Sequence, residues 1–173
     1  MKLLVHSIQG PENAVNGVFP IGIASMAAEA GHEVNIFLAG NAVSLMKTEI
    51  VENMSAIGVG KLSDYMKVIK DKGIKIALDD FGAGYASLKY VRDLPIDVIK
   101  LDKHFTFNVS DPATARLISF VSEVCEDLQL EMIGEGIETE EDKKMMLDLG
   151  CQIGQGYLMH RPGFLDSFSK KGI

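Results

Sequence analysis

Short apolar runs alternate with helix-like segments along this chain, and this alternation constrains its fold more than any other feature. Buried strands are predicted at 2–8, 33–39, 74–79, 98–102, 131–135 and 153–158. Helices are predicted at 13–30, 42–53, 86–93, 112–128 and 164–170, with two more that begin near Ser63 and at Thr139. Asn41 is a suitable cap for the helix at 42–53.

Strands that alternate with helices predict parallel βαβ units with right-handed crossovers. We therefore expect an α/β fold with a six-stranded, mostly parallel sheet and helices on both faces. Six predicted strands are too few for a closed eight-stranded barrel, so the sheet is expected to be flavodoxin-like or a half-barrel. In a flavodoxin-like sheet, strand 74–79 would lie beside strand 2–8.

Composition limits the classes of partner. The chain has 173 residues and a net charge of −7, which argues against nucleic acid and against an anionic membrane surface as partners. No apolar stretch reaches membrane-spanning length. The two cysteines, Cys125 and Cys151, are not in a CxxC spacing, so we expect a reducing cytoplasmic location and two core thiols.

Polar side chains gather where the later predicted strands end, which is where parallel α/β folds bind ligands. These residues are Asp79, Asp80, Lys100, Asp102, Glu135, Glu138 and Gln155. Carboxylates are the ligands that Mg²⁺ prefers, and two metal ions can clamp the two oxygens of a phosphoryl displacement. Glu135 is a candidate base for a metal-bound water, and Lys100 is a candidate to orient that water or offset phosphate charge. The alternative is that the paired acids before a glycine turn are solvated loop charges or helix caps.

Four motifs in these segments resemble the C-terminal half of EAL-domain cyclic-di-GMP phosphodiesterases. They are LDDFGAGYASL, PIDVIKLD, GEGIET and GCQIGQGYLMHRP, and the resemblance covers about residues 74–166. It implies a (β/α)8-barrel origin, Mg²⁺ or Mn²⁺ as cofactor and cyclic-di-GMP as ligand. By motif, Asp79 and Asp80 resemble the metal-binding aspartates, and Asp102, which resembles the acid near Lys100, is assigned to the metal with them. Lys100 and Glu135 resemble the catalytic lysine and the general base.

The same resemblance gives Glu138 the place of a glutamate that steadies the glycine-rich loop, and Gln155 that of a substrate-binding glutamine. The first strands of the family supply further metal ligands, including the EAL motif itself, and this chain has no counterpart to them. Glu49, Glu52 and Asn53 fall on a predicted helix rather than at strand ends. We therefore expect a partial, weak metal site and a catalytically inactive chain.

The first part of the chain resembles a different family. GPEN, AAEAGHEV and FLAGNAV within residues 1–73 are similar to DsrE-like proteins, which form flavodoxin-like sheets and are commonly oligomeric. The resemblances predict a DsrE-like βαβα fragment at 1–73 joined to an EAL-like (βα)4 fragment at 74–173, with one shared core. A half-barrel would leave an apolar face and strand edges exposed, which favours a homodimer. Two alternatives to an EAL remnant stay open: an oligomerising module without chemistry, and a recombined chimera without a selected activity.

Overall fold

The computed structural model describes residues 1–83, 91–92 and 94–163. The helices predicted at 86–93 and 164–170 lie outside the described residues or on their margin. Six parallel strands form the main sheet: β1 (Lys2–Ser7), β2 (Glu33–Leu38), β5 (Ile76–Phe81), β6 (Val98–Leu101), β7 (Glu131–Glu135) and β8 (Ile153–Gln155).

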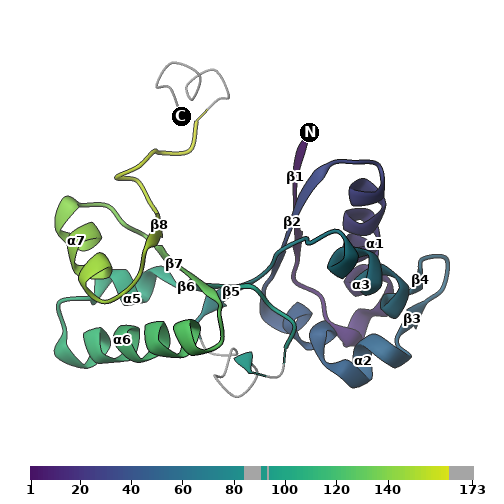
Figure 1. Ribbon diagram of the computed structural model, residues 1–173, viewed down its shortest axis with the longest axis horizontal. Coiled ribbons are helices and arrows are strands. Elements are labelled where there is room, and N and C mark those ends of the chain that lie inside the picture. The colour runs from purple at the N-terminus through teal and green to yellow at the C-terminus, as the bar shows by residue number, and fades with distance from the viewer. Residues whose placement is uncertain (84–90, 93, 164–173) are drawn as a thin grey trace.

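The strands follow one another across the sheet in chain order, β1-β2-β5-β6-β7-β8 (Figure 1). The predicted α/β class and six-stranded parallel sheet are confirmed, and the sheet is the half-barrel alternative. The flavodoxin-like order is wrong for this chain, because β5 pairs with β2 and not with β1. Apolar runs and crossover lengths are compatible with both orders, so the sequence pattern left them open.

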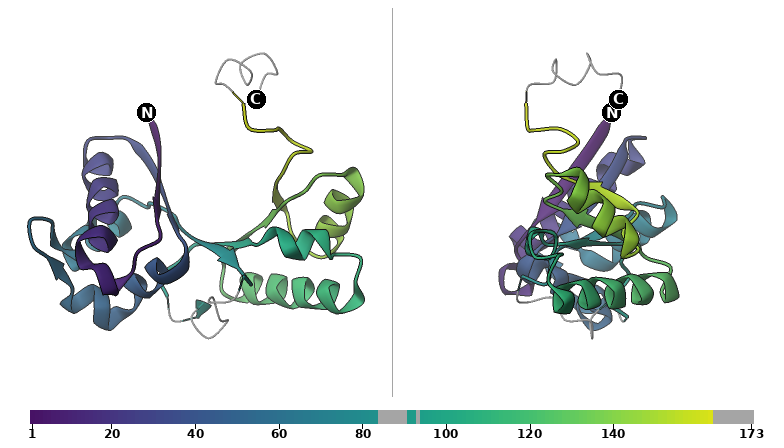
Figure 2. Two further views of the ribbon diagram at one scale, coloured as in Figure 1. Left: turned by 180° about the vertical axis from the view of Figure 1, so that it is seen from behind. Right: turned by 90° about the vertical axis from the view of Figure 1, so that its left-hand side faces the viewer.

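Helices fill the connections between the strands. They are η1 (Pro11–Asn13), α1 (Ala14–Glu29), η2 (Gly40–Met46), α2 (Thr48–Asn53), α3 (Leu62–Asp71), α5 (Lys103–Phe107), α6 (Pro112–Asp127) and α7 (Glu140–Asp148). A small antiparallel hairpin of β3 (Ser55–Ala56) and β4 (Gly60–Lys61) precedes α3. Figure 2 shows α1, α2 and α3 gathered at one end of the sheet, and α5, α6 and α7 at the other. No described helix is long and apolar enough to cross a membrane.

Three local predictions need correction. The helix predicted at 42–53 is two pieces, η2 and α2, because Lys47 between them is extended; η2 follows Ala39, and Asn41 is not its cap. The strand predicted at 153–158 ends at Gln155. There the chain turns back against Ile137, so closely that a Cβ at Gly156 would lie 2.0 Å from the Ile137 carbonyl oxygen. Neither the β3–β4 hairpin nor α5 was predicted.

One face of the sheet is covered and the other is open. Side chains alternate across a strand, and in β2 the buried Val34, Ile36 and Leu38 join the core beneath α1 and α3. On the opposite face Leu4 is exposed, and a cavity of about 510 Å³ lies over β1, β2, β5, β6 and β7. Helices were expected on both faces of the sheet. In the structure, α1 contacts β1 and β2 on the face of the sheet that carries the core.

Candidate functional site

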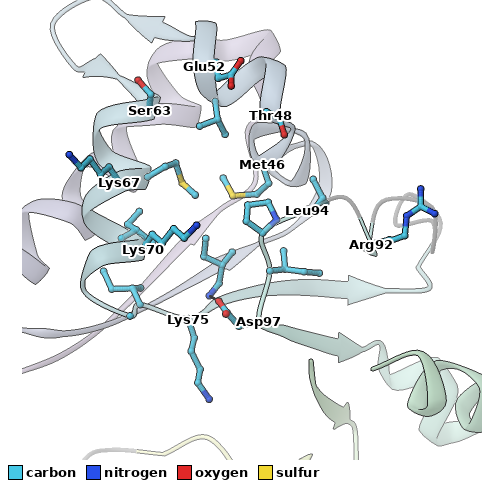
Figure 3. A pocket seen from close by; sticks show the side chains of 18 residues that line it. Met46, Thr48, Glu52, Ser63, Lys67, Lys70, Lys75, Arg92, Leu94 and Asp97 are labelled. Atoms are coloured by element: carbon cyan, nitrogen blue, oxygen red, sulfur yellow. Dashed lines mark hydrogen bonds between the residues drawn. The ribbon is translucent and has the colours of Figure 1, made fainter. Parts of the chain in front are cut away.

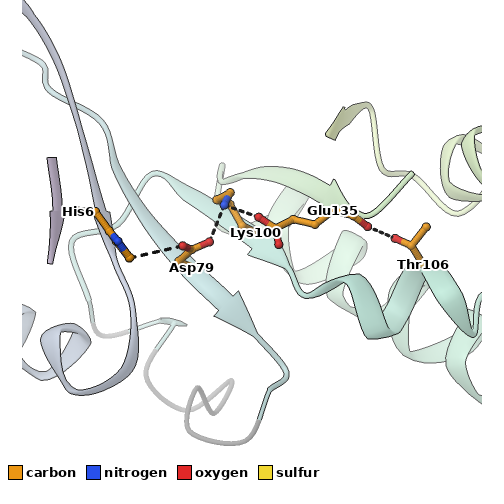
Figure 4. A network of polar contacts seen from close by, with 5 residues as sticks. All are labelled: His6, Asp79, Lys100, Thr106 and Glu135. Carbon is orange, nitrogen blue, oxygen red and sulfur yellow. Dashed lines mark hydrogen bonds and ion pairs between the residues drawn. The ribbon is translucent and has the colours of Figure 1, made fainter. Parts of the chain in front are cut away.

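The open face carries one row of side chains across the carboxyl ends of all six strands. Strand register places His6 beside Phe37 on β1 and β2, and Glu135 beside Gln155 on β7 and β8. Asp79 on β5 and Lys100 on β6 point to the same face between these pairs (Figure 4). The sequential strand order therefore turns residues that are far apart in the chain into neighbours.

A break in strand pairing brings the two aspartates together. The register of β5 against β6 shifts between Leu78 and Phe81, and Asp80 adopts a left-handed backbone with φ of 52°. In a regular strand, Asp79 and Asp80 would point to opposite faces. With this bulge, carboxylate oxygens of Asp79, Asp80 and Glu135 all lie within 4.8 Å of one another. The irregularity begins before the glycine turn at Gly82.

Lys100 is the centre of the row. Its Nζ donates to Asp79 Oδ1 at 2.6 Å and also forms an ion pair with Glu135 Oε1 (Figure 4). The Lys100 side chain is 7% exposed, against 15% for Asp79 and 20% for Glu135. The same ammonium lies 4.7 Å from the centre of the Phe37 ring, which gives it a cation–π contact.

The protonation of Lys100 follows from these contacts. Burial by itself lowers the pKa of the Lys100 ammonium, because it disfavours the charged form. The hydrogen bonds and negative charges of Asp79 and Glu135 outweigh that cost, and the pKa of Lys100 is raised above its ordinary value. The site therefore holds a buried cation between two carboxylates at neutral pH.

His6 belongs to this row, although it comes from the part of the chain that offers no carboxylate at its strand ends. Its Nε2 lies 3.8 Å from Asp79 Oδ2, whereas the hydrogen bond from Lys100 goes to Asp79 Oδ1. In the sequence, His6 lies near the end of the first predicted strand, next to Ser7. Its position on the exposed side of β1 was the available signal, but only the strand order shows that it faces Asp79.

The remaining predicted site residues lie around the row with different contacts. Gln155 lies on the open face next to Glu135. Glu138 is exposed, and its backbone N donates to the Asp142 side chain in the capping region of α7. Asp102 is not brought to the carboxylate cluster. It caps α5, accepting from the backbone N of His104 at 2.8 Å and lying 3.0 Å from His104 Nδ1.

The donor set of the cluster suits a hard divalent cation, because three carboxylates converge on one region at a strand end. Asp79, Asp80 and Glu135 are the described residues that would hold it. The Lys100 ammonium supplies one positive charge to the same carboxylates, and this balances part of their repulsion. An incoming cation would therefore compete with an internal cation.

A larger cavity lies elsewhere, at the amino end of β5 between α2, α3 and residues 94–97 (Figure 3). Its volume is about 860 Å³, and aliphatic and methionine side chains such as Met46, Met66 and Ile69 line much of it. Asp97 on its wall is already bonded to the backbone N of Ile76 at 2.8 Å. Cavity volume alone would make this the candidate functional site, but the clustered carboxylates lie at the other end of the strands.

Comparison with known proteins gives matches over most of the chain. The EAL domain family profile matches residues 33–162, so the match begins at the first residue of β2. The chain is 30% identical over 145 residues to cyclic di-GMP phosphodiesterase NbdA of Pseudomonas aeruginosa, which covers 82% of this chain and 18% of that protein.

Solved structures show the same fold. The cAMP and cyclic-di-GMP bound form of EAL enzyme Bd1971 matches with a TM-score of 0.70 at 24% identity, over 98% of this chain and 42% of that one. The manganese and cyclic-di-GMP complex of Klebsiella pneumoniae BlrP1 matches with a TM-score of 0.65 at 23% identity, over 88% of this chain and 37% of that one. The likeness therefore extends to β1 and α1, beyond the part that the sequence motifs cover.

Proposed function

The chain belongs to the EAL domain family, and on that basis we propose that it is a remnant of a cyclic-di-GMP phosphodiesterase with a partial, inactive site. The observation that carries this proposal is the convergence of the Asp79, Asp80 and Glu135 carboxylates, with Asp79 and Glu135 both paired to the buried Lys100. Relatives support the ligand class: NbdA is a cyclic di-GMP phosphodiesterase, and BlrP1 has been solved with manganese and that dinucleotide. The chain spans less than a fifth of the length of NbdA.

In this proposal, Asp79, Asp80 and Glu135 hold Mg²⁺ or Mn²⁺ weakly. A bound divalent ion would polarise a phosphodiester and acidify a water molecule. Glu135 is positioned as the acceptor for a proton from that water, and Lys100 offsets phosphate charge while it holds Asp79 and Glu135 in place. Gln155 lies beside Glu135 and is assigned to the dinucleotide, with Glu138 steadying the loop that follows β7.

The proposed loss of catalytic turnover follows from the absence of metal-binding carboxylates at the ends of the first two strands, both of which the structure describes in full. β1 ends in His6 and Ser7 and β2 in Phe37 and Leu38, so neither described strand end places a carboxylate beside Asp79. Few protein ligands mean weak binding of Mg²⁺, which loses its own water reluctantly. With the ion poorly held, both the attacking and the leaving oxygen lack the charge stabilisation that phosphoryl transfer needs.

Titration calorimetry with cyclic-di-GMP in the presence of MnCl2 tests this proposal. We expect weak, metal-dependent heat that Asp79→Asn removes. Asp102→Asn is the matched control, because Asp102 caps α5 outside the cluster, and it should leave the heat unchanged. The absence of heat at high micromolar ligand would overturn the remnant proposal, and hydrolysis at the rate of an intact EAL enzyme would overturn the claim of inactivity.

The origin of residues 1–73 belongs to the same proposal. We infer a DsrE-like fragment there, joined to an EAL-like fragment at 74–173 and sharing one core with it. The sequence pieces GPEN, AAEAGHEV and FLAGNAV support this origin, as does the lack of strand-end carboxylates in β1 and β2. A module or chimera without chemistry is the alternative function, and the calorimetric experiment separates it from the remnant.

A homodimer is also part of the proposal, and α1 is the surface that supports it. Val15, Phe19, Ile23 and Met26 form an exposed stripe on a helix that has no charged residue before Glu29. A helix that is apolar on all sides is usually buried. An antiparallel pair of α1 helices would cover the stripe and place Glu29 near the positive end of the partner helix. Light scattering should show a dimer that Phe19→Glu dissociates and Phe107→Glu, on α5, does not.

We propose a cytoplasmic location because both cysteine thiols are free. Cys125 and Cys151 are both free and buried. Buried free thiols suit a reducing compartment, where disulfides are rare.

A further inference from the structure

We propose that Thr106 on α5 is a positioning residue for Glu135, whose carboxylate it keeps within the cluster by holding the end of β7 in place. The inference rests on the proposed metal site and adds to it a residue that comes from a helix and not from a strand end. Thr106 was not among the site residues that the sequence predicted.

The contact between Thr106 and Glu135 joins a buried hydroxyl to the backbone at a strand end. Thr106 is 1% exposed, and its Oγ1 donates to the carbonyl oxygen of Glu135 at 2.5 Å (Figure 4). That separation lies within the range for a hydroxyl donor. A buried polar group that loses its partner carries a desolvation cost. The hydrogen bond therefore holds α5 and the end of β7 together at this point.

The end of β7 depends on α5 because β6 stops short of it. The last pair between β6 and β7 is Leu101 with Gly134, one residue before Glu135. Beyond that pair the chain leaves β6 and enters α5, which contacts β7. A Cβ at Gly136 would lie only 2.7 Å from the Cβ of Lys103, so α5 packs closely against the residue that follows Glu135. On this side, α5 thus supports the strand end where β6 no longer does.

The position of the Glu135 backbone decides what its carboxylate can reach. Glu135 Oε1 forms an ion pair with Lys100. The same carboxylate supplies one of the three oxygens that lie within 4.8 Å of one another in the cluster. Metal ligands need to be held to within about 0.5 Å of their working geometry. The bond from Thr106 goes to the main chain of Glu135, so Thr106 acts on the carboxylate through the backbone.

Calorimetric titration of the full chain with MnCl2 tests this inference. Thr106→Val keeps the size and branching of the side chain but removes the donor, and it should weaken Mn²⁺ binding about tenfold, the lower end of the range for groups that orient metal ligands. Thr106→Ser keeps the hydroxyl and should restore most of the affinity. Tyr65→Phe is the matched control, because the Tyr65 hydroxyl also donates to a backbone carbonyl, that of Val59 in the β3–β4 hairpin. It should leave Mn²⁺ binding unchanged.

A second readout needs no metal. The ¹³C resonance of the Glu135 carboxylate, recorded in metal-free buffer at one fixed pH, reports its pairing with Lys100. Thr106→Val should move this resonance toward the position of a solvent-exposed glutamate, and Thr106→Ser should return it toward the wild-type position. Tyr65→Phe should leave it in place. A purely structural role for Thr106 would lower the stability of the chain without moving the carboxylate resonance.

The outcomes separate this inference from the proposed function. If Thr106→Val destabilises the chain but leaves both the Mn²⁺ affinity and the Glu135 resonance unchanged, the metal site stands and the positioning role is refuted. Failure of Thr106→Ser to restore the affinity or the resonance would refute the role of the hydroxyl. If the wild-type chain binds no Mn²⁺, the proposed metal site fails and the resonance decides the inference. A shift in Thr106→Val that Thr106→Ser reverses then confirms it, and the absence of a shift overturns it.

Discussion

The carboxyl ends of β1 and β2 and those of β5, β6 and β7 lie along one edge of one sheet, yet they carry different chemistry. β1 and β2 end in the buried Ser7 and Leu38 and present His6 and Phe37 to the open face. The later strands present acids and a buried lysine. The same backbone architecture thus carries a cluster of charged side chains at one end of the sheet and none at the other, which shows that the fold places strand ends together but does not decide their chemistry.

The strongest test of this difference is Lys100→Met. It keeps the apolar stem but leaves Asp79 and Glu135 facing each other without a cation, which should cost about 3–5 kcal/mol in the free energy of unfolding. Urea denaturation measures the loss, and excess Mn²⁺ should restore part of it by replacing the missing charge. Lys75→Met is the control: Lys75 pairs with Glu131 with both side chains about half exposed, and such pairs contribute about 1 kcal/mol or less. Equal losses would contradict a special role for the buried network.

Leu38→Ala tests the N-terminal strand end. Leu38 is fully buried at the end of β2, and truncation should cost about 3 kcal/mol by loss of apolar contacts and creation of a cavity. Metal affinity of the folded fraction should stay unchanged, because Leu38 faces the core and not the open face. A large fall in metal affinity together with normal stability would mean that the two strand ends are not as distinct as the contacts indicate.

Two glycine variants compare the ends of the sheet at the backbone level. Gly82 has φ of 100°, and a Cβ there would lie 2.1 Å from the Phe105 ring. Gly82→Ala should therefore cost about 2 kcal/mol and weaken metal binding by moving the Asp79-Asp80 bulge. Gly31 after α1 has φ of 82° with nothing near its Cβ position, so Gly31→Ala should cost about 1 kcal/mol without affecting metal. Equal effects on metal affinity in calorimetry would argue against the role of the bulge.

The smallest expected effect concerns Cys125, in the C-terminal half. Burial raises the pKa of the Cys125 thiol to about 11 from an ordinary value of 9.0. The folded state disfavours the Cys125 thiolate, whereas the unfolded state allows it to form above about pH 9. The buried Cys125 thiol therefore contributes its full stabilisation below pH 9, and this stabilisation is lost as the pH rises from about 9 to about 11. The loss should be about 1 kcal/mol at pH 10. Unfolding curves of the wild type and of Cys125→Ala should converge over this range, and parallel curves would contradict the shifted pKa.

Much of this molecule follows from the sequence because the signals are local. Apolar runs near the observed strands predicted all six, and the Asp79-Asp80 pair, Lys100 and Glu135 were predicted as one constellation by their strand-end positions. Family membership also follows from ordered motifs. The broken helix at Lys47 and the short β8 were missed because each depends on backbone conformation or on close packing against Ile137.

Only the tertiary structure decided the strand order, the open face and the partners within the site. Crossover connections of similar length allow β5 to pair with either β1 or β2, and only packing over the whole sheet distinguishes these pairings. That choice brings His6 to Asp79 from 73 positions away in the chain and moves Asp102 out of the cluster to cap α5. The sequence determined which chemical groups are present at the strand ends, because side-chain chemistry is local. The fold determined which of them meet, because long-range contacts depend on the arrangement of every strand between them.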